Sequence, residues 1–337
     1  MRIAHIYFIP YSHHPIRESF YICMYYTAKF VKLSTCYGYY LAIFLFCGMI
    51  EVSRLNFKED FHMVSFDRFK DGKRYALTFS YDDGCAQDRR LVALFDKYGM
   101  KATFNLNSRN MLNPNTKGIR PEEVRPLFIE KGHEVATHSF SHPHLDRMLI
   151  KDQYDEIMRD REELEKASGT IVRGHAYPFG TYNKDTFTAM DTASIVYGRT
   201  ASASNNFTLP NDFKIWVPTT HHNECELPVK RFIYNVEKAP WRAGGVLYIW
   251  GHSYEFDNEK SPVQWEKFEE ILSELSKRTY DIWCATNIEI YDYVNAQKQI
   301  RRSADGKIFH NPTDIDVWIA IDDQPLCIEA GKTVVID

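Results

Sequence analysis

The stretch Ala76–Gly84, with the sequence ALTFSYDDG, decides how the rest of the chain is interpreted. It is an apolar run rich in strand-forming residues, and it ends in two adjacent carboxylates, Asp82 and Asp83. A strand that ends this way places polar side chains at its carboxyl end, where barrels and open α/β sheets build their sites. Neighbouring side chains of a strand point in opposite directions, so the two carboxylates share a site only if the chain turns at once, as Gly84 allows. The alternative is an ordinary strand followed by an Asp-Gly turn.

A second stretch, residues 132–145 (GHEVATHSFSHPHL), again leads from a short apolar strand into polar residues. His138 and His142 are four residues apart, so one helical turn would place both imidazoles on one face. Imidazole is a common ligand of divalent metals, and an Asp oxygen is a normal companion. Two His and one carboxylate leave coordination positions open, which is typical of a catalytic site. This spacing is weak evidence alone, but beside an Asp-Asp-Gly strand end it predicts a metal site.

These residues resemble a known family. SYDDG at 80–84 resembles the first motif of the polysaccharide deacetylases, which are metal-dependent carbohydrate esterases, and HSFSH at 138–142 resembles their second, H-[ST]-x-x-H. The resemblance extends over roughly residues 74–295. It implies an α/β fold with a distorted, incomplete (β/α) barrel, whereas the alternation of strands and helices alone indicates only a parallel barrel or open sheet.

The resemblance also implies roles for individual residues. Asp83, His138 and His142 would be the metal ligands, with zinc as the expected ion and cobalt, nickel or manganese as alternatives. Asp82 would be the general base that takes a proton from the attacking water, and His252 would be the general acid. A carboxylate that caps a turn is the alternative interpretation of Asp82.

His252 follows the apolar run 246–250 and matches the late motif of the family, in which hydrophobic residues precede a histidine. Without the other motifs, a structural histidine at a strand end would be an equally good interpretation. Glu255 or Asp281 could orient His252, and the sequence does not choose between them.

AYPFG at 176–180 partly matches the third family motif, Arg-Pro-Pro-Tyr-Gly. The match implies that a backbone N–H group, that of Phe179, completes an oxyanion hole, with Tyr177 beside it in the substrate site. The motif's Arg, which orders the catalytic base, is replaced by an alanine. Arg173 and Arg199 are the candidates to take its place, and either could instead be a surface residue.

Further residues near the motifs have weaker assignments. Trp250 or Leu247 could line a small pocket for the acetyl methyl group. The adjacent His221 and His222 are interpreted as a solvated pair on a loop. The fourth family motif, an Asp-rich stretch with Trp, is not recognisable near residues 197–200.

Hydrophobic periodicity predicts the order of the secondary structure. Strands are expected over 75–80, 101–106, 133–137, 171–175, 194–200, 214–219, 245–250 and 281–285. Helices are expected over 88–98, 121–131, 149–167, 229–238, 264–277 and 288–299. Short strand-like runs separated by turn signals follow residue 302, so we expect a catalytic domain over 63–300 and a small β appendage over 301–337.

The composition of the 337-residue chain is that of a globular protein, with 44% hydrophobic and 26% charged residues. A net charge of −4 and the lack of a dense Lys/Arg stripe exclude a nucleic-acid footprint. The seven scattered cysteines contain no C-x-x-C pair and are expected to be reduced thiols. The expected partner is a carbohydrate substrate, and nothing in the sequence indicates an oligomeric state.

Residues 1–62 differ from the rest and are expected to be a leader. The uncharged run 33–50 is just long enough for a membrane anchor, and the preceding Lys29 and Lys32 would then place the catalytic domain outside the cell. In our favoured hypothesis translation instead starts at Met63, because residues 58–60 can be encoded by AAGGAGGAT, a ribosome-binding sequence. The protein would then be cytoplasmic, and a tryptic peptide from upstream of Met63 in the native protein would contradict this.

The sequence as a whole predicts a metal-dependent deacetylase of N-acetylated sugars. A first alternative is a hydrolase of another carbon–nitrogen amide, such as a cyclic imide or ureide, since the third and fourth motifs are atypical. A second alternative is a catalytically silent carbohydrate-binding protein. The presence of both a base, Asp82, and an acid, His252, argues against a silent site.

Overall fold

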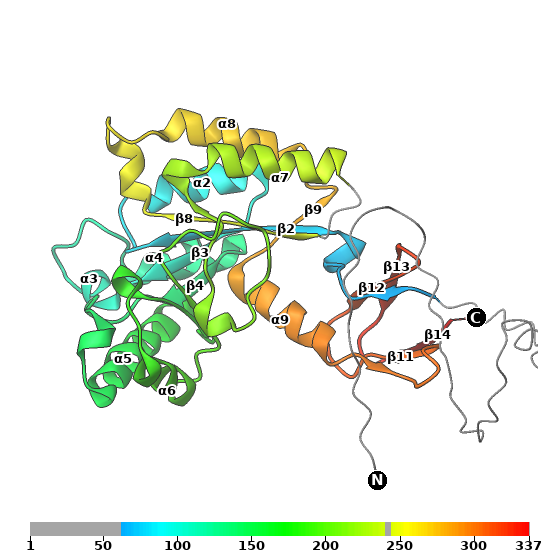
Figure 1. Cartoon of the computed structure of the whole chain (residues 1–337). Coiled ribbons are helices and arrows are strands. Elements are labelled where there is room, and N and C mark those ends of the chain that lie inside the picture. The colour runs from blue at the N-terminus through cyan, green and yellow to red at the C-terminus, as the bar shows by residue number, and fades with distance from the viewer. Residues whose placement is uncertain (1–61, 240–243, 337) are drawn as a thin grey trace, which may run out of the picture. The chain divides into compact units, whose positions relative to one another are not determined.

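The computed structural model describes residues 62–239 and 244–336, and within them a parallel sheet of eight strands forms the centre of the fold (Figure 1). The strand order is β6-β5-β4-β3-β2-β8-β7, with β9 paired to β2. The strands are β2 (Tyr75–Asp82), β3 (Thr103–Leu106), β4 (Glu134–Thr137), β5 (Gly174–Ala176), β6 (Tyr197–Arg199), β7 (Thr220–His221), β8 (Gly245–Gly251) and β9 (Ile282–Cys284).

Strand β2 lies at the middle of this sheet. It pairs with β8 on one side, and on the other it pairs with β9 near its start and with β3 near its end. Asp82 lies opposite Asn105 of β3, and Tyr81 lies opposite Gly251 of β8. Because every pair in this sheet is parallel, the carboxyl ends of the strands meet at one edge, where α/β proteins build their sites.

Helices surround the sheet, and Figure 1 shows α2, α7 and α8 together on one side of β2 and β8. The helices are α2 (Asp88–Tyr98), α3 (Ser108–Met111), α4 (Pro121–Leu127), α5 (Ile150–Ser168), α6 (Lys184–Thr192), α7 (Glu226–Lys238), α8 (Trp265–Ser276) and α9 (Asn287–Lys298). The largest apolar core lies under them, where the buried rings of Phe79, Phe95 and Phe268 pack together. This burial is the main source of stability for such a layered fold.

The other face of β2 is polar and forms a hydrogen-bonded column that leads to the end of the strand. Thr78 donates to the Asn287 side chain over 2.8 Å. Further along, the Asn105 amide donates to Ser80 Oγ and to Asp82 Oδ1, at 2.8 Å in each case. These groups are buried, so their mutual hydrogen bonds offset the cost of removing them from water.

One bridge connects the β6 edge of the sheet to the segment that leads into β7, the other edge strand, and so curls the sheet into a barrel. Arg199 at the end of β6 pairs with Trp216, whose N–H donates to the Gly198 carbonyl over 2.9 Å. A few residues on, the Thr219 N–H donates to the Tyr248 carbonyl of β8, also over 2.9 Å. The fold is therefore a distorted, incomplete (β/α) barrel, as the family resemblance implied.

Most predicted elements occur within a few residues of their expected bounds, but one predicted strand is wrong and some observed elements were not predicted. The strand predicted over 214–219 is wrong, because Phe213–Ile215 forms a 3-10 turn and only one bridge joins this segment to β6, so regular pairing begins at β7. Helix α6 was not predicted. Its signal is the cap at Asn183, whose side chain accepts the Thr186 N–H.

After α9 the chain forms two small antiparallel sheets. Their strands are β1 (Val64–Ser65), β10 (Arg301–Arg302), β11 (Ile308–His310), β12 (Val317–Ile321), β13 (Gln324–Ile328) and β14 (Thr333–Val335). Strand β1 precedes the barrel in the sequence but pairs with β12. A small core of Phe309, Ile319 and Ile328 supports these sheets. The division of the chain at residues 300 and 301 stays a prediction.

No helix in the described part of the chain is long and apolar enough to cross a membrane. The apolar run 33–50 lies outside the described residues.

Candidate active site

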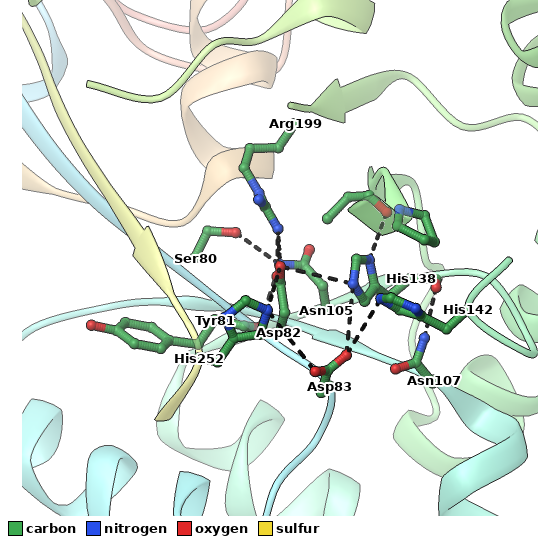
Figure 2. A network of polar contacts seen from close by, with 12 residues as sticks. Ser80, Tyr81, Asp82, Asp83, Asn105, Asn107, His138, His142, Arg199 and His252 are labelled. Atoms are coloured by element: carbon green, nitrogen blue, oxygen red, sulfur yellow. Dashed lines mark hydrogen bonds and ion pairs between the residues drawn. The ribbon is translucent and has the colours of Figure 1, made fainter. Parts of the chain in front are cut away.

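The two sequence motifs meet at the carboxyl edge of the sheet, as Figure 2 shows. Asp82 is the last residue of β2, and it points into the barrel with the polar column. Asp83 and Gly84 both adopt left-handed backbone conformations, with φ of 78° and 63°. Because the chain turns at Asp83 as well as at the glycine, both carboxylates face the same site.

Asp83, His138 and His142 converge as a group of potential metal ligands. Asp83 Oδ1 lies 3.7 Å from His138 Nε2 and 3.8 Å from His142 Nε2. The three ligand atoms lie within 4.8 Å of one another. Distances this long are not hydrogen bonds, and one carboxylate oxygen with two imidazole nitrogens is a donor set that divalent metals prefer. The residues present therefore fit a metal.

The loop that carries the two histidines differs from its prediction. Residues 138–142 are not helical, and Ser139 and His142 have left-handed φ angles of 60° and 58°. Two left-handed residues prevent a regular helical turn, which would need right-handed angles throughout. The imidazoles nevertheless meet, with ring centroids 4.7 Å apart, because the loop folds back on itself.

Buried contacts fix the orientation of His138. Its Nδ1 lies 2.7 Å from the Ala176 carbonyl oxygen, which can only accept, so the proton is on Nδ1 and the Nε2 lone pair faces Asp83. Burial, the largest effect, lowers the pKa of His138 and favours the neutral ring. Its backbone N–H donates to Asp160 over 2.9 Å, and the Asn107 amide donates to its carbonyl over 2.7 Å. Neither support was predicted, because neither Asp160 nor Asn107 belongs to a motif.

Asp82 is a buried carboxylate held by a buried cation. Arg199 Nη2 lies 2.5 Å from each of its carboxyl oxygens, and the Asn105 amide donates to Oδ1. Burial would raise its pKa, but the charge of Arg199, followed by those of His138 and His252, outweighs burial and lowers the pKa to about 2. Asp82 is therefore ionised at neutral pH, which a general base requires.

The structure separates the two arginine candidates. Arg199 is 1% exposed, contacts Asp82 and places its guanidinium 4.5 Å above the Trp250 ring. Arg173 instead pairs with Asp292 of α9 and does not contact the carboxylate pair. Only Arg199 has the position expected of the residue that orders the base.

His252 follows β8 and faces the same two carboxylates. Its Nε2 lies 3.9 Å from Asp82 Oδ2 and 3.9 Å from Asp83 Oδ2. Burial would lower its pKa, but Glu255 and the two Asp carboxylates outweigh burial and raise it. Glu255 Oε1 lies 3.5 Å from His252 Nδ1. Asp281 precedes β9 at the opposite end of the strands, so Glu255 is the carboxylate near this ring.

The aromatic candidates have different environments. Phe179 has a left-handed φ of 57°, is 57% exposed and stacks on His144 with ring centroids 4.0 Å apart. Trp250 is nearly buried, next to Arg199. The Tyr177 ring belongs to the core, where its hydroxyl donates to the Lys214 carbonyl, so this side chain does not line the site.

The remaining two weaker assignments change with the structure. Leu247 points into the helix-covered core and is fully buried there. His221 and His222 are not a solvated pair, because His222 is fully buried and both Nε2 atoms lie close to Glu255. No local pattern predicts this contact, because it joins residues more than 30 positions apart in the chain.

Asp88, at the start of α2, gives a pH-dependent prediction. It is buried, it accepts from Ser253 Oγ over 2.6 Å, and burial, the largest effect, raises its pKa to about 7. A raised folded-state pKa means that the contribution of Asp88 to stability is highest below about pH 4 and falls as the pH rises to 7, by at most about 4 kcal/mol. We expect Asp88→Asn to reduce the fall of the thermal midpoint between pH 5 and 8. The exposed Asp155→Asn should leave that fall unchanged, and an equal slope in all three proteins would contradict the prediction.

Part of the chain is similar to known proteins. Residues 68–198 match the family described as polysaccharide deacetylase. The peptidoglycan-N-acetylmuramic acid deacetylase PdaC of Bacillus subtilis is 34% identical over 117 residues, which cover 34% of this chain and 23% of the relative. The peptidoglycan-N-acetylglucosamine deacetylase PgdA of Listeria monocytogenes is 28% identical over 116 residues, which again cover 34% of this chain and 23% of the relative.

The structural comparison adds to the fold assignment. A candidate polysaccharide deacetylase from Mycobacterium smegmatis has a TM-score of 0.53 at 17% identity, over 70% of this chain and 95% of that one. At this identity the likeness concerns the fold alone. Together with the sequence match, it confirms the predicted resemblance, and residues 68–198 are similar to the polysaccharide deacetylase family. The chain spans about a quarter of the length of the curated relatives named above.

Proposed function

We propose that the protein is a metal-dependent hydrolase of acetamide groups on N-acetylated sugars. The observation that carries this proposal is the convergence of Asp83, His138 and His142 beside an ionised buried carboxylate, Asp82, and a histidine, His252. The family match and the peptidoglycan deacetylases named above support the class of substrate.

The first three residues would hold the metal, and zinc is the proposed ion because its common ligands include His nitrogen and Asp oxygen. A bound divalent cation lowers the pKa of a water molecule and polarises a carbonyl group. Cobalt, nickel and manganese accept similar donors and are the alternative ions.

The protein's own groups would move the protons. Asp82 takes a proton from the attacking water, whose oxygen forms a bond to the acetyl carbon. The bond between that carbon and the sugar nitrogen then breaks, and His252 supplies the proton that the leaving amine needs. The products are acetate and a free amino group. Arg199 keeps Asp82 ionised and fixes its orientation.

Two further groups would contact the substrate. We assign the backbone N–H of Phe179 to the developing oxyanion, since Phe179 lies on the loop beside His142. Trp250 is the proposed lining of the acetyl pocket. The sequence-based proposals for the domain limits and for the protein's location in the cell stay predictions.

Acetate release tests the proposed function. We expect protein begun at Met63 to release acetate from chitooligosaccharides or peptidoglycan fragments when loaded with zinc or cobalt. Chelation should abolish release and reloading should restore it, because water activation depends on the cation. A loaded protein with one metal per chain that releases no acetate from either substrate would contradict the proposal.

A further inference from the structure

A second cluster of titratable side chains lies behind His252. His221 is the last residue of β7 and His222 follows it, whereas Glu255 follows β8, the neighbouring strand. Glu255 Oε2 lies 3.1 Å from His221 Nε2 and 3.0 Å from His222 Nε2. The other oxygen of the same carboxylate, Oε1, lies 3.5 Å from His252 Nδ1. Glu255 therefore connects the partly exposed His221 and the buried His222 to the ring that faces Asp82 and Asp83.

The packing around His222 is specific for a flat ring. It is fully buried and lies between Tyr81 and Phe256, with ring centroids 5.8 and 4.3 Å away and nearly parallel planes. A Cβ atom at Gly251 would lie 2.1 Å from His222 Nδ1, so the imidazole occupies the space that the glycine leaves. A phenyl ring would satisfy this packing as well. What the imidazole adds is a buried Nε2 atom whose one near polar neighbour is Glu255, at ion-pair distance rather than in a hydrogen bond of good geometry.

The cluster has the residue types of a metal site, but one contact argues against metal binding. The Asn223 backbone N–H donates to His221 Nδ1 over 3.2 Å. A nitrogen that accepts this bond carries no proton, so the proton of the neutral ring is on Nε2, the atom that faces Glu255. An Nε2–H group stabilises a carboxylate and cannot be a metal ligand.

We infer that His221 and His222 are positioning residues that hold the Glu255 carboxylate in place, so that Glu255 keeps a proton on His252 Nδ1. The Nε2 atom of His252 then faces Asp82, Asp83 and the substrate. This inference rests on the proposed function, because it gives the proposed acid its orientation. It extends that function to residues that no family motif contains.

Two substitutions of His222 separate positioning from packing. His222→Phe keeps a flat ring between Tyr81 and Phe256 but removes the N–H group. His222→Gln loses the ring but retains an amide N–H at about the same distance along the side chain. If only packing matters, Phe should be the better replacement. If the contact with Glu255 matters, Gln should be better.

Two substrates distinguish loss of the general acid from damage to the rest of the site. An N-acetylated sugar releases an amine that needs a proton, whereas 4-nitrophenyl acetate releases a phenolate that does not. We expect His222→Phe to lower kcat on the chitooligosaccharide by about tenfold or more and Glu255→Gln by about 100-fold, within the range of general acid catalysis. Hydrolysis of 4-nitrophenyl acetate and KM for the sugar should change little. Equal losses on both substrates, or better activity with Phe than with Gln, would overturn the inference.

A third measurement does not depend on activity. In ¹⁵N-histidine NMR spectra of the zinc-loaded protein, with the His252 signals identified from a His252→Gln variant, neutral His252 should carry its proton on Nδ1. In Glu255→Gln and His222→Phe the Nε2–H form should appear. An unchanged tautomer, or a second metal equivalent per chain that His221→Ala removes, would contradict the inference. Failure of the proposed function alone would instead leave this spectrum as expected while the wild type released no acetate.

Discussion

Asp82→Asn is expected to abolish acetate release while leaving metal binding intact. The amide has almost the shape of the carboxylate but cannot take a proton from water, so we expect kcat to fall by about 1,000-fold or more. The three proposed metal ligands, Asp83, His138 and His142, are unchanged. Metal content measured on the same preparation as acetate release therefore separates loss of the base from loss of the metal.

A matched control is available on the surface. Asp96 also forms an ion pair, with Lys131, but its side chain is 36% exposed and lies on α2 away from the site. Asp96→Asn makes the same chemical change and should leave activity unchanged. If Asp82→Asn kept more than about a tenth of wild-type kcat, Asp82 could not be the base, given the usual size of base catalysis.

The second large effect concerns stability. Arg199→Met would leave the Asp82 carboxylate buried without its cation, and we expect the free energy of unfolding to fall by about 3–5 kcal/mol. Activity should fall too. A buried carboxylate without a cation has a raised pKa, and Asp82 cannot take a proton from water when it is itself protonated. Denaturant unfolding of the metal-free protein measures the first effect without interference from metal binding.

Two further proteins test this explanation. In the double variant Asp82→Asn/Arg199→Met neither charge remains, so much of the lost stability should return while activity stays absent. Arg173→Met removes the ion pair with Asp292, in which each side chain is about one third exposed. Such pairs contribute about 0–1 kcal/mol, so this variant should lose little stability. A double variant less stable than either single variant would show that packing, not the unpaired charge, explains the loss.

The parts of the fold that the sequence predicted are those with strong local signals. Strand β2 and helix α2 have clear apolar periodicity, and left-handed Gly99 ends α2 as expected. The segment over 214–219 has strand-like composition, but only a bridge from Trp216 to β6 holds it, so composition did not determine its pairing. Helix α6 has a weaker apolar pattern and is recognised chiefly by its cap at Asn183.

The candidate site likewise has residues whose positions the sequence predicted and residues whose positions it did not. Asp82, Asp83 and the two histidines lie in short motifs, so their proximity could be predicted from strand ends alone. The choice between Arg199 and Arg173 could not, because it depends on which face of which strand each residue occupies. The contact of His222 with Glu255 also depends on the register of β7 against β8, which no local pattern contains.

The polar column below Asp82 has a consequence for the cost of reaching the transition state. Asn105 contacts both Ser80 and Asp82, so rotation of any one of these side chains would break a buried hydrogen bond. The chain loses this rotational freedom when it folds rather than when a sugar arrives. In the proposed reaction the free energy of substrate binding therefore need not be spent on ordering Asp82, and it remains for orienting the acetyl group.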